Sequence, residues 1–128
     1  MTSKKRQDII AAIKRISGKF HLNSGNCGVF AVALNKIFGG KGKYIAVVEE
    51  YEPEYISHVA LKYNNTLFDG NGVTTLKDMK SYGFNEKHPK QHISFMEVDE
   101  YTVLKWTNPD ISVSKMELEL RKETKRVV

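Results

Sequence analysis

The spacing of apolar positions predicts two helices at the start of the chain. Isoleucines recur at helical intervals between residues 4 and 17, with Ser3 placed to cap the first turn and Gly18 placed to end the helix. After the polar stretch NSGN, a second apolar stripe runs from residue 27 to 38 and stops at the glycine-rich stretch GGKG. Both segments are therefore predicted as helices with a buried face.

Runs of β-branched and aromatic residues mark the strands that follow. The run KYIAVVEEY, residues 43–51, predicts a strand, and we expect an acidic loop around Pro53. The stretch SHVALKYNNTLFDGNG, residues 57–72, predicts two strands joined at Asn64 and Asn65, because asparagine tolerates the positive φ angles of a tight hairpin turn. A hairpin is the clearest local feature of the sequence.

The remaining elements complete an α+β pattern. A short helix is expected over 75–82, and QHISFMEV, residues 91–98, predicts another strand. In the last third, KMELEL alternates like a strand, but Ser114 and Glu117 form a capping-box pattern that favours a helix. The order of elements predicts N-terminal helices packed on an antiparallel sheet.

Composition supports a single folded domain over residues 1–128. Apolar residues make up 41% of the chain and charged residues 27%, which is typical of a globular domain. The formal charge of +5 leaves an acidic partner open, but aromatic residues are not interleaved with the lysines, so we do not expect nucleic acid as the partner. No stretch has the character of a signal peptide or a membrane span, so we expect a cytoplasmic protein without a membrane partner.

Cys27 is the single cysteine of the chain and is predicted to begin the second helix. A helix N-terminus lowers the pKa of a thiol through its partial positive charge and its backbone N–H groups. Gly25 and Gly28 flank Cys27, so a carbonyl substrate could approach the sulfur closely. The alternative is a small apolar residue packed under a loop, which is the commonest fate of a free cysteine.

The hairpin supplies a base and an orienting group for such a thiol. Counting outward from the turn places Ala60 opposite Asp69 and His58 opposite Asn71. Because side chains alternate along a strand, these four residues share one face of the sheet. Asp69, or alternatively Asn71, is then expected to accept a hydrogen bond from one ring nitrogen of His58.

This arrangement resembles the papain-like cysteine peptidase superfamily in its broad sense, which includes NlpC-type peptidases and transglutaminase-like proteins. The resemblance rests on GNCGVFAVAL and HVALKYNNTLFDGNG and covers about residues 20–72. It implies a helix with cysteine at its N-terminus, an antiparallel sheet, and a catalytic triad of Cys27, His58 and Asp69. Residues 85–128 are then strand and helix additions to a minimal papain-like core. We expect them to complete and cover the sheet or, alternatively, to form the substrate-recognition surface.

The resemblance departs from the family at the oxyanion hole. Papain-like peptidases carry a glutamine about six residues before the cysteine, and His21 occupies that position here. Asn23 and Asn26 are nearby substitutes that carry an amide donor. Any of the three could complete an oxyanion hole with the backbone N–H of Cys27.

The sequence therefore predicts a thiol hydrolase that cleaves an amide, peptide or isopeptide bond in a protein or peptide substrate. A non-catalytic interaction domain on the same fold is the alternative, as is a transglutaminase-like or deamidase-like acyltransferase. We expect no cofactor and no metal, because one cysteine and widely spaced histidines give no ligand pattern. His88 and His92 are expected at the surface.

Overall fold

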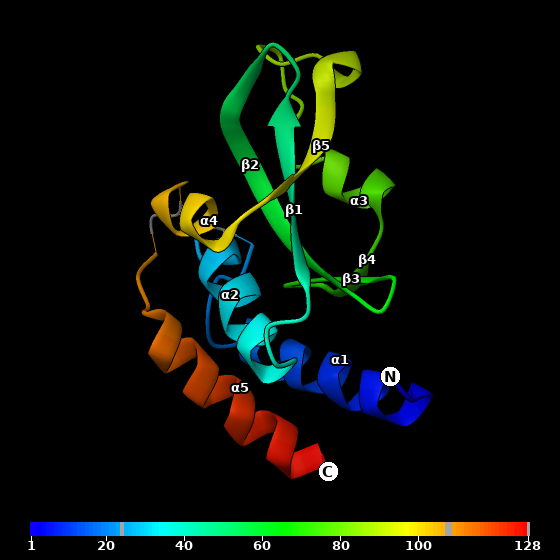
Figure 1. Ribbon diagram of the computed structural model, residues 1–128, viewed down its shortest axis with the longest axis vertical. Helices are drawn as coiled ribbons and strands as arrows, with labels where there is room; N and C mark the ends of the chain where they lie inside the picture. Colours follow the sequence, from blue (N-terminus) through cyan, green and yellow to red (C-terminus); the bar gives the residue numbers. More distant parts are fainter. Residues whose placement is uncertain (24, 107–108, 128) are drawn as a thin grey trace.

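The computed structural model describes residues 1–23, 25–106 and 109–127, and within them it confirms an α+β fold with an antiparallel sheet (Figure 1). The helices are α1 (Ser3–Ser17), α2 (Cys27–Ile37), α3 (Leu76–Lys80), α4 (Glu100–Trp106), α5 (Val113–Val127) and the short 3-10 helix η1 (Lys90–His92). The strands are β1 (Lys43–Glu49), β2 (Glu52–Tyr63), β3 (Thr66–Asp69), β4 (Gly72–Thr74) and β5 (Ile93–Val98). They form a sheet of order β4-β3-β2-β1-β5.

Helices α1 and α2 form where the apolar spacing predicts them. The N-cap of α1 is Thr2 and not Ser3, because the Thr2 hydroxyl accepts a hydrogen bond from the backbone N–H of Lys5 at 3.1 Å. Helix α2 is buried along most of its length, since it lies between the sheet on one side and α1 and α5 on the other (Figure 1). An apolar helix in this position contributes to the core on several sides.

Strand β2 is the central element of the sheet and is longer than predicted. Pro53, expected in a loop, lies inside β2 next to a register shift in the pairing with β1. A proline has no N–H to donate, so it is tolerated at such an irregularity. At the other end of β2, Asn64 and Asn65 have φ angles of 51° and 60°, and Tyr63 pairs with Thr66, which confirms the predicted hairpin.

The C-terminal third extends the sheet by one strand, as predicted, and adds a helix to the helical layer. Strand β5 pairs antiparallel with β1, and α5 packs against α1 and α2. Helix α5 begins at Val113 because Ser112, and not Ser114, accepts a hydrogen bond from the backbone N–H of Lys115. Helix α4, which the sequence analysis did not predict, is capped by Asp99 through the N–H of Thr102.

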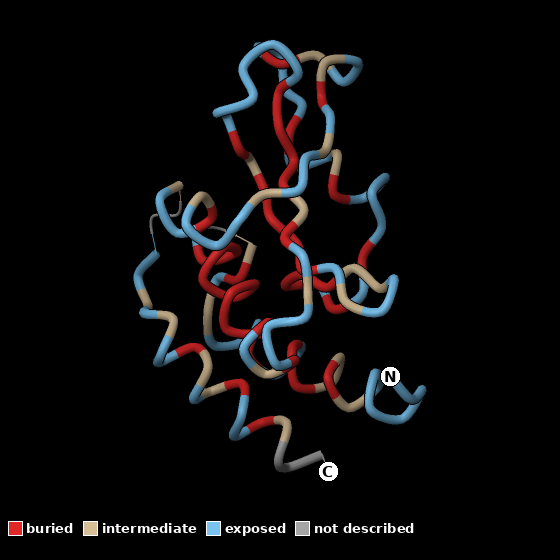
Figure 2. The backbone as a smooth tube through the Cα atoms, in the orientation of Figure 1, coloured by how far each residue is buried: buried red, intermediate tan, exposed pale blue. Residues whose placement is uncertain are grey.

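The two faces of the sheet are covered differently. One face packs on α1, α2, α4 and α5 and holds the main core, including Val59, Leu61 and Phe68. The other face holds a smaller apolar cluster of Val47, Ala60, Met79 and Ile93 near α3. Buried residues therefore concentrate along the strands and the inner helices, whereas the tip of the β1–β2 hairpin and the start of α1 are exposed (Figure 2). Among the described helices, none has the length and apolar character needed to cross a membrane.

Candidate active site

Cys27 and its neighbour Asn26 are both buried, with exposed fractions of 3% and 1%. The Asn26 side chain donates to the Asp110 carboxylate at 2.8 Å and accepts from the Asp110 backbone N–H at 3.2 Å. These two bonds join the segment before α2 to the segment before α5. They use the amide oxygen and one of the two amide N–H groups of Asn26, and they hold the chain in place beside Cys27.

His58 and Asp69 form a buried hydrogen-bonded pair. The Nε2 atom of His58, on β2, lies 3.0 Å from Oδ2 of Asp69 at the end of β3, and the exposed fractions are 0% and 1%. The contact predicted from the hairpin register is therefore present. The second oxygen of Asp69 accepts the backbone N–H of Asn71 at 2.9 Å, so both carboxylate oxygens have donors and the group is held in one orientation.

The environment of His58 favours its protonated form. Burial alone lowers the pKa of a histidine, but the hydrogen bond with Asp69 and the nearby Cys27 side chain outweigh burial and raise the pKa of His58 to about 9. The remaining ring nitrogen, Nδ1, is buried and makes no hydrogen bond of standard geometry with any described residue. Cys27 nonetheless lies close enough to the imidazole to raise the pKa of His58.

Tyr82 covers the imidazole, and sequence reasoning did not identify this residue as part of the site. Its ring stacks on that of His58 with centroids 4.1 Å apart and an angle of 11° between the planes. The Tyr82 hydroxyl accepts a hydrogen bond from the side-chain amide of Asn71 at 2.9 Å. A tyrosine predicted only as the end of a short helix carries no sequence signal for this role.

Asn71 does not lie opposite His58, so the predicted register is wrong at this position. Strand β3 ends at Asp69 and pairs with β4, which was not predicted, so the chain turns at Gly70 and Asn71 instead of continuing along β2. Among the described residues, Asn71 makes side-chain hydrogen bonds with Asn23 and Tyr82, and none with His58. It therefore positions Asp69 and Tyr82 and does not orient the imidazole directly.

The turn after β3 is fixed from both sides by the N-terminal part of the chain. The Ser17 hydroxyl donates to the Gly70 carbonyl at 2.6 Å, and the Asn23 side-chain oxygen accepts the Gly70 N–H at 3.1 Å. A Cβ atom at Gly70 would lie 2.6 Å from the Cβ of Leu22, so only glycine fits this close approach. The clamp sets where Asp69 sits relative to His58.

The other candidates occupy less central positions. His21 is exposed and, with Asn23 and Asn71, lines a hollow of about 250 Å³ beside the Gly70 turn. His88, expected at the surface, is 7% exposed because it stacks on Tyr55 with centroids 4.4 Å apart. The expectation of a surface position for His88 is therefore wrong, because the segment before β5 lies against the outer half of β2.

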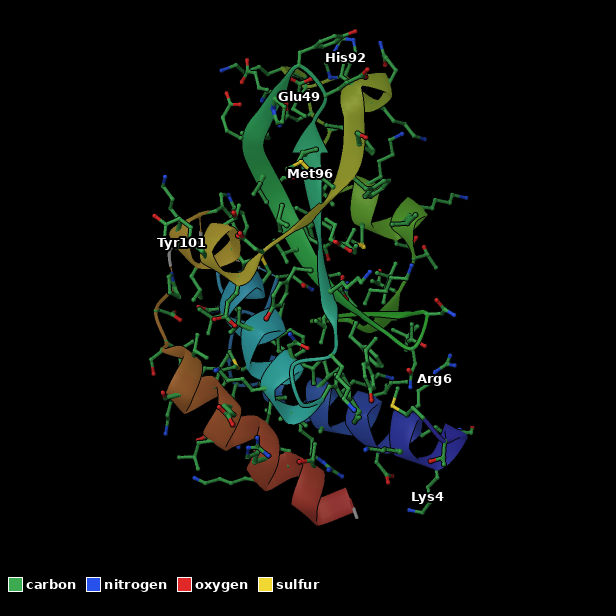
Figure 3. All side chains as sticks on the ribbon, in the orientation of Figure 1. Lys4, Arg6, Glu49, His92, Met96 and Tyr101 are labelled. Atoms are coloured by element: carbon green, nitrogen blue, oxygen red, sulfur yellow. The ribbon has the colours of Figure 1, made fainter. Side chains whose placement is uncertain are left out.

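His92 marks the opposite end of the sheet from α2, where it lies near Glu49 (Figure 3). The His92 carbonyl accepts the N–H of Glu50 at 2.6 Å, and its ring contacts Tyr51 edge-on. Within the described ranges, no three side chains of histidine, cysteine, aspartate or glutamate gather as they would around a metal ion. The His58–Asp69 pair beside Cys27 is the group of side chains that could take part in a reaction.

Family models, curated protein sequences and solved structures were compared with the chain, and none of the three comparisons gave a match.

Proposed function

We propose that the chain is a cysteine-dependent acyl-transfer enzyme that hydrolyses an amide, peptide or isopeptide bond through Cys27, His58 and Asp69. The observation that supports this most is the buried imidazole between a thiol and a carboxylate, with the pKa of His58 raised to about 9. A histidine that stays protonated at neutral pH stabilises a neighbouring thiolate, which is the reactive form of cysteine. We propose a single papain-like domain over residues 1–128 that acts in the cytoplasm as a thiol peptidase or amidase.

The proposed reaction has two steps. The Cys27 thiolate attacks the carbonyl carbon, the C–N bond breaks, and the His58 imidazolium gives its proton to the departing amine, which leaves a thioester. Water then attacks the thioester while His58 accepts its proton, so that a carboxylic acid forms and the thiolate returns. Asp69 keeps the imidazole oriented and stabilises its positive charge through both steps.

The oxyanion in both steps needs hydrogen-bond donors near the sulfur. We place Cys27 at the N-terminus of α2, where helix geometry leaves the first backbone N–H groups without intrahelical acceptors. The Cys27 N–H is the first donor in this proposal. The candidates for the second are His21, Asn23 and Asn26, since each of the two amides carries a second N–H besides the one bonded to Asn71 or Asp110.

The closed state of the site favours a second candidate function. Cys27, His58 and Asp69 have exposed fractions of 3%, 0% and 1%, and Tyr82 stacks over the imidazole, so a substrate enters only if this cover moves. A non-catalytic interaction domain needs no such movement. Transfer of the acyl group to an amine instead of water uses the same three residues and differs only in which nucleophile reaches the thioester.

Alkylation of Cys27 by iodoacetamide tests the proposal. Because His58 holds a positive charge beside the thiol up to about pH 9, the wild type should react at about pH 6.5 at least about tenfold faster than His58→Ala. The two rates should converge above about pH 9, where an ordinary thiol is ionised without help. Adduct formation is measured by intact mass.

Labelling in urea shows that the thiol is intact and provides the reference rate for an unfolded chain. Asp69→Asn should fall between the wild type and His58→Ala, because the imidazole remains but loses its carboxylate. Equal labelling of wild type and His58→Ala across the pH range would rule out an activated thiol and favour the interaction domain.

A further inference from the structure

A hollow of about 580 Å³ lies next to the candidate active site, on the side of α3. We call it the Tyr82 hollow and define it by Asn71, Val73, Lys77, Tyr82, Phe84 and Lys90. It meets the candidate site at two residues, Asn71 and Tyr82. A ligand in the hollow would therefore touch the ring that stacks on His58 and the amide that bonds the Tyr82 hydroxyl.

Part of the wall of the hollow is apolar and accessible. Val73, Tyr82 and Phe84 have exposed fractions of 36%, 36% and 39%, so each is an exposed large apolar side chain. Three such side chains around one concave site differ from apolar residues scattered singly over a surface. Their arrangement suits an apolar or aromatic side chain of a ligand.

The hollow also carries a net positive charge. Lys77 and Lys90 both line it, and within the described residues neither forms an ion pair. The Lys90 ammonium lies 5.9 Å from the centroid of the Phe84 ring, so it stands over the apolar wall. One carboxylate, that of Asp78, lies in the same lining, which leaves a net positive charge.

We propose that the Tyr82 hollow binds a peptide segment that carries an apolar or aromatic side chain flanked by carboxylates. The apolar side chain would pack against Val73 and Phe84, and the carboxylates would pair with Lys77 and Lys90. This inference rests on the proposed function in one respect, which is that the bound peptide is part of the enzyme's substrate. Binding itself requires no reaction at Cys27.

Charge and shape favour a peptide over a nucleic acid. A phosphate backbone is bound by runs of lysine and arginine that neutralise several phosphates, whereas the hollow offers two lysines and one carboxylate. A second hollow, of about 480 Å³, is lined by residues of β2, β5 and α4, among them Met96 and Tyr101, which are labelled in Figure 3. Neither Asn71 nor Tyr82 is part of its lining, so it does not adjoin the candidate site through these residues.

The experiment measures binding without catalysis. Cys27→Ala is titrated into fluorescein-labelled Ala-Glu-Phe-Glu-Ala-amide, Ala-Lys-Phe-Lys-Ala-amide and Ala-Glu-Ser-Glu-Ala-amide, with fluorescence anisotropy as the readout. The acidic phenylalanine peptide should bind about tenfold tighter than either of the others. The same affinity should fall by about tenfold in a background of Lys77→Glu with Lys90→Glu, and should not change with Lys41→Glu, an exposed lysine outside the hollow.

Each result tests peptide binding in the Tyr82 hollow independently of any reaction at Cys27. Equal affinities for the acidic and basic peptides, or equal loss with Lys41→Glu, would overturn the inference even if Cys27 alkylation shows an activated thiol. A labelled single-stranded oligonucleotide that binds tighter than the acidic peptide would also overturn it. Selective peptide binding together with an inert Cys27 would leave the hollow standing as the site of an interaction domain and refute the enzyme.

Discussion

Raising the pH from about 6 to about 9.5 should remove the stability that protonation of His58 contributes to the folded protein. The pKa of this histidine is about 9 in the folded chain against an ordinary value of 6.5, so folding favours its protonated form. Its contribution to stability is complete below about pH 6.5, declines as the pH rises towards 9, and is absent above 9. A pKa change of this size corresponds to about 3 kcal/mol, a large part of the 5–15 kcal/mol that is typical of a domain.

The assay is urea unfolding followed by the fluorescence of Trp106, the single tryptophan, which packs against the main core. Wild type and His58→Gln are compared at about pH 6 and about pH 9.5, because other groups titrate in both proteins and cancel in the difference. We expect the free energy of unfolding of the wild type to fall by about 3 kcal/mol more than that of His58→Gln.

Equal losses in the two proteins would refute the reasoning. The imidazole resonances of the wild type provide an independent check by NMR, and they also serve if His58→Gln does not fold. A His58 that titrates at or below 6.5 would show that burial outweighs the hydrogen bond to Asp69 and the effect of Cys27. The charge-stabilised thiolate of the proposed mechanism would then lose its support.

Two further substitutions test the packing that positions the site. Gly70→Ala should lower the free energy of unfolding by about 1–3 kcal/mol, because its Cβ would lie 2.6 Å from that of Leu22, whereas Gly18→Ala, with a nearest contact of 3.4 Å, should change it little. Leu120→Ala should cost about 2–5 kcal/mol because this side chain is fully buried in the main core, while Leu118→Ala, 49% exposed on the same helix, should stay within about 0.5 kcal/mol. Urea unfolding measures both, and comparable values within either pair would contradict the packing described here.

The hairpin shows how far local sequence reasoning reaches at this site. Asn64 and Asn65 adopt the positive φ angles that their side chains tolerate, and the strand register follows outward from them as far as Leu61 and Phe68. The contact between His58 and Asp69 lies just beyond that range and was still predicted, because alternation places both residues on one face. Local geometry is therefore sufficient to predict contacts for as long as the two strands of the hairpin run side by side.

The same reasoning failed two residues further along. The position of Asn71 depends on where β3 stops, and β3 stops because Ser17 and Asn23 hold Gly70 and because β4 returns beside it. Ser17 and Asn23 lie 53 and 47 residues from Gly70 in sequence, so no pattern near Asn71 indicates these contacts. Tyr82 was missed for a similar reason, since its stacking on His58 depends on the path of the chain after α3.

The sequence by itself determined the class of fold, the hairpin, and the face that His58 and Asp69 share, because helical spacing, strand alternation and turn chemistry act over a few residues. Tertiary structure alone decided that Cys27 raises the pKa of His58, that Tyr82 covers the imidazole, and that the Asn26 side chain bonds to Asp110. Periodicity specifies which side of an element a residue faces, but the neighbour it meets depends on how whole helices and strands pack.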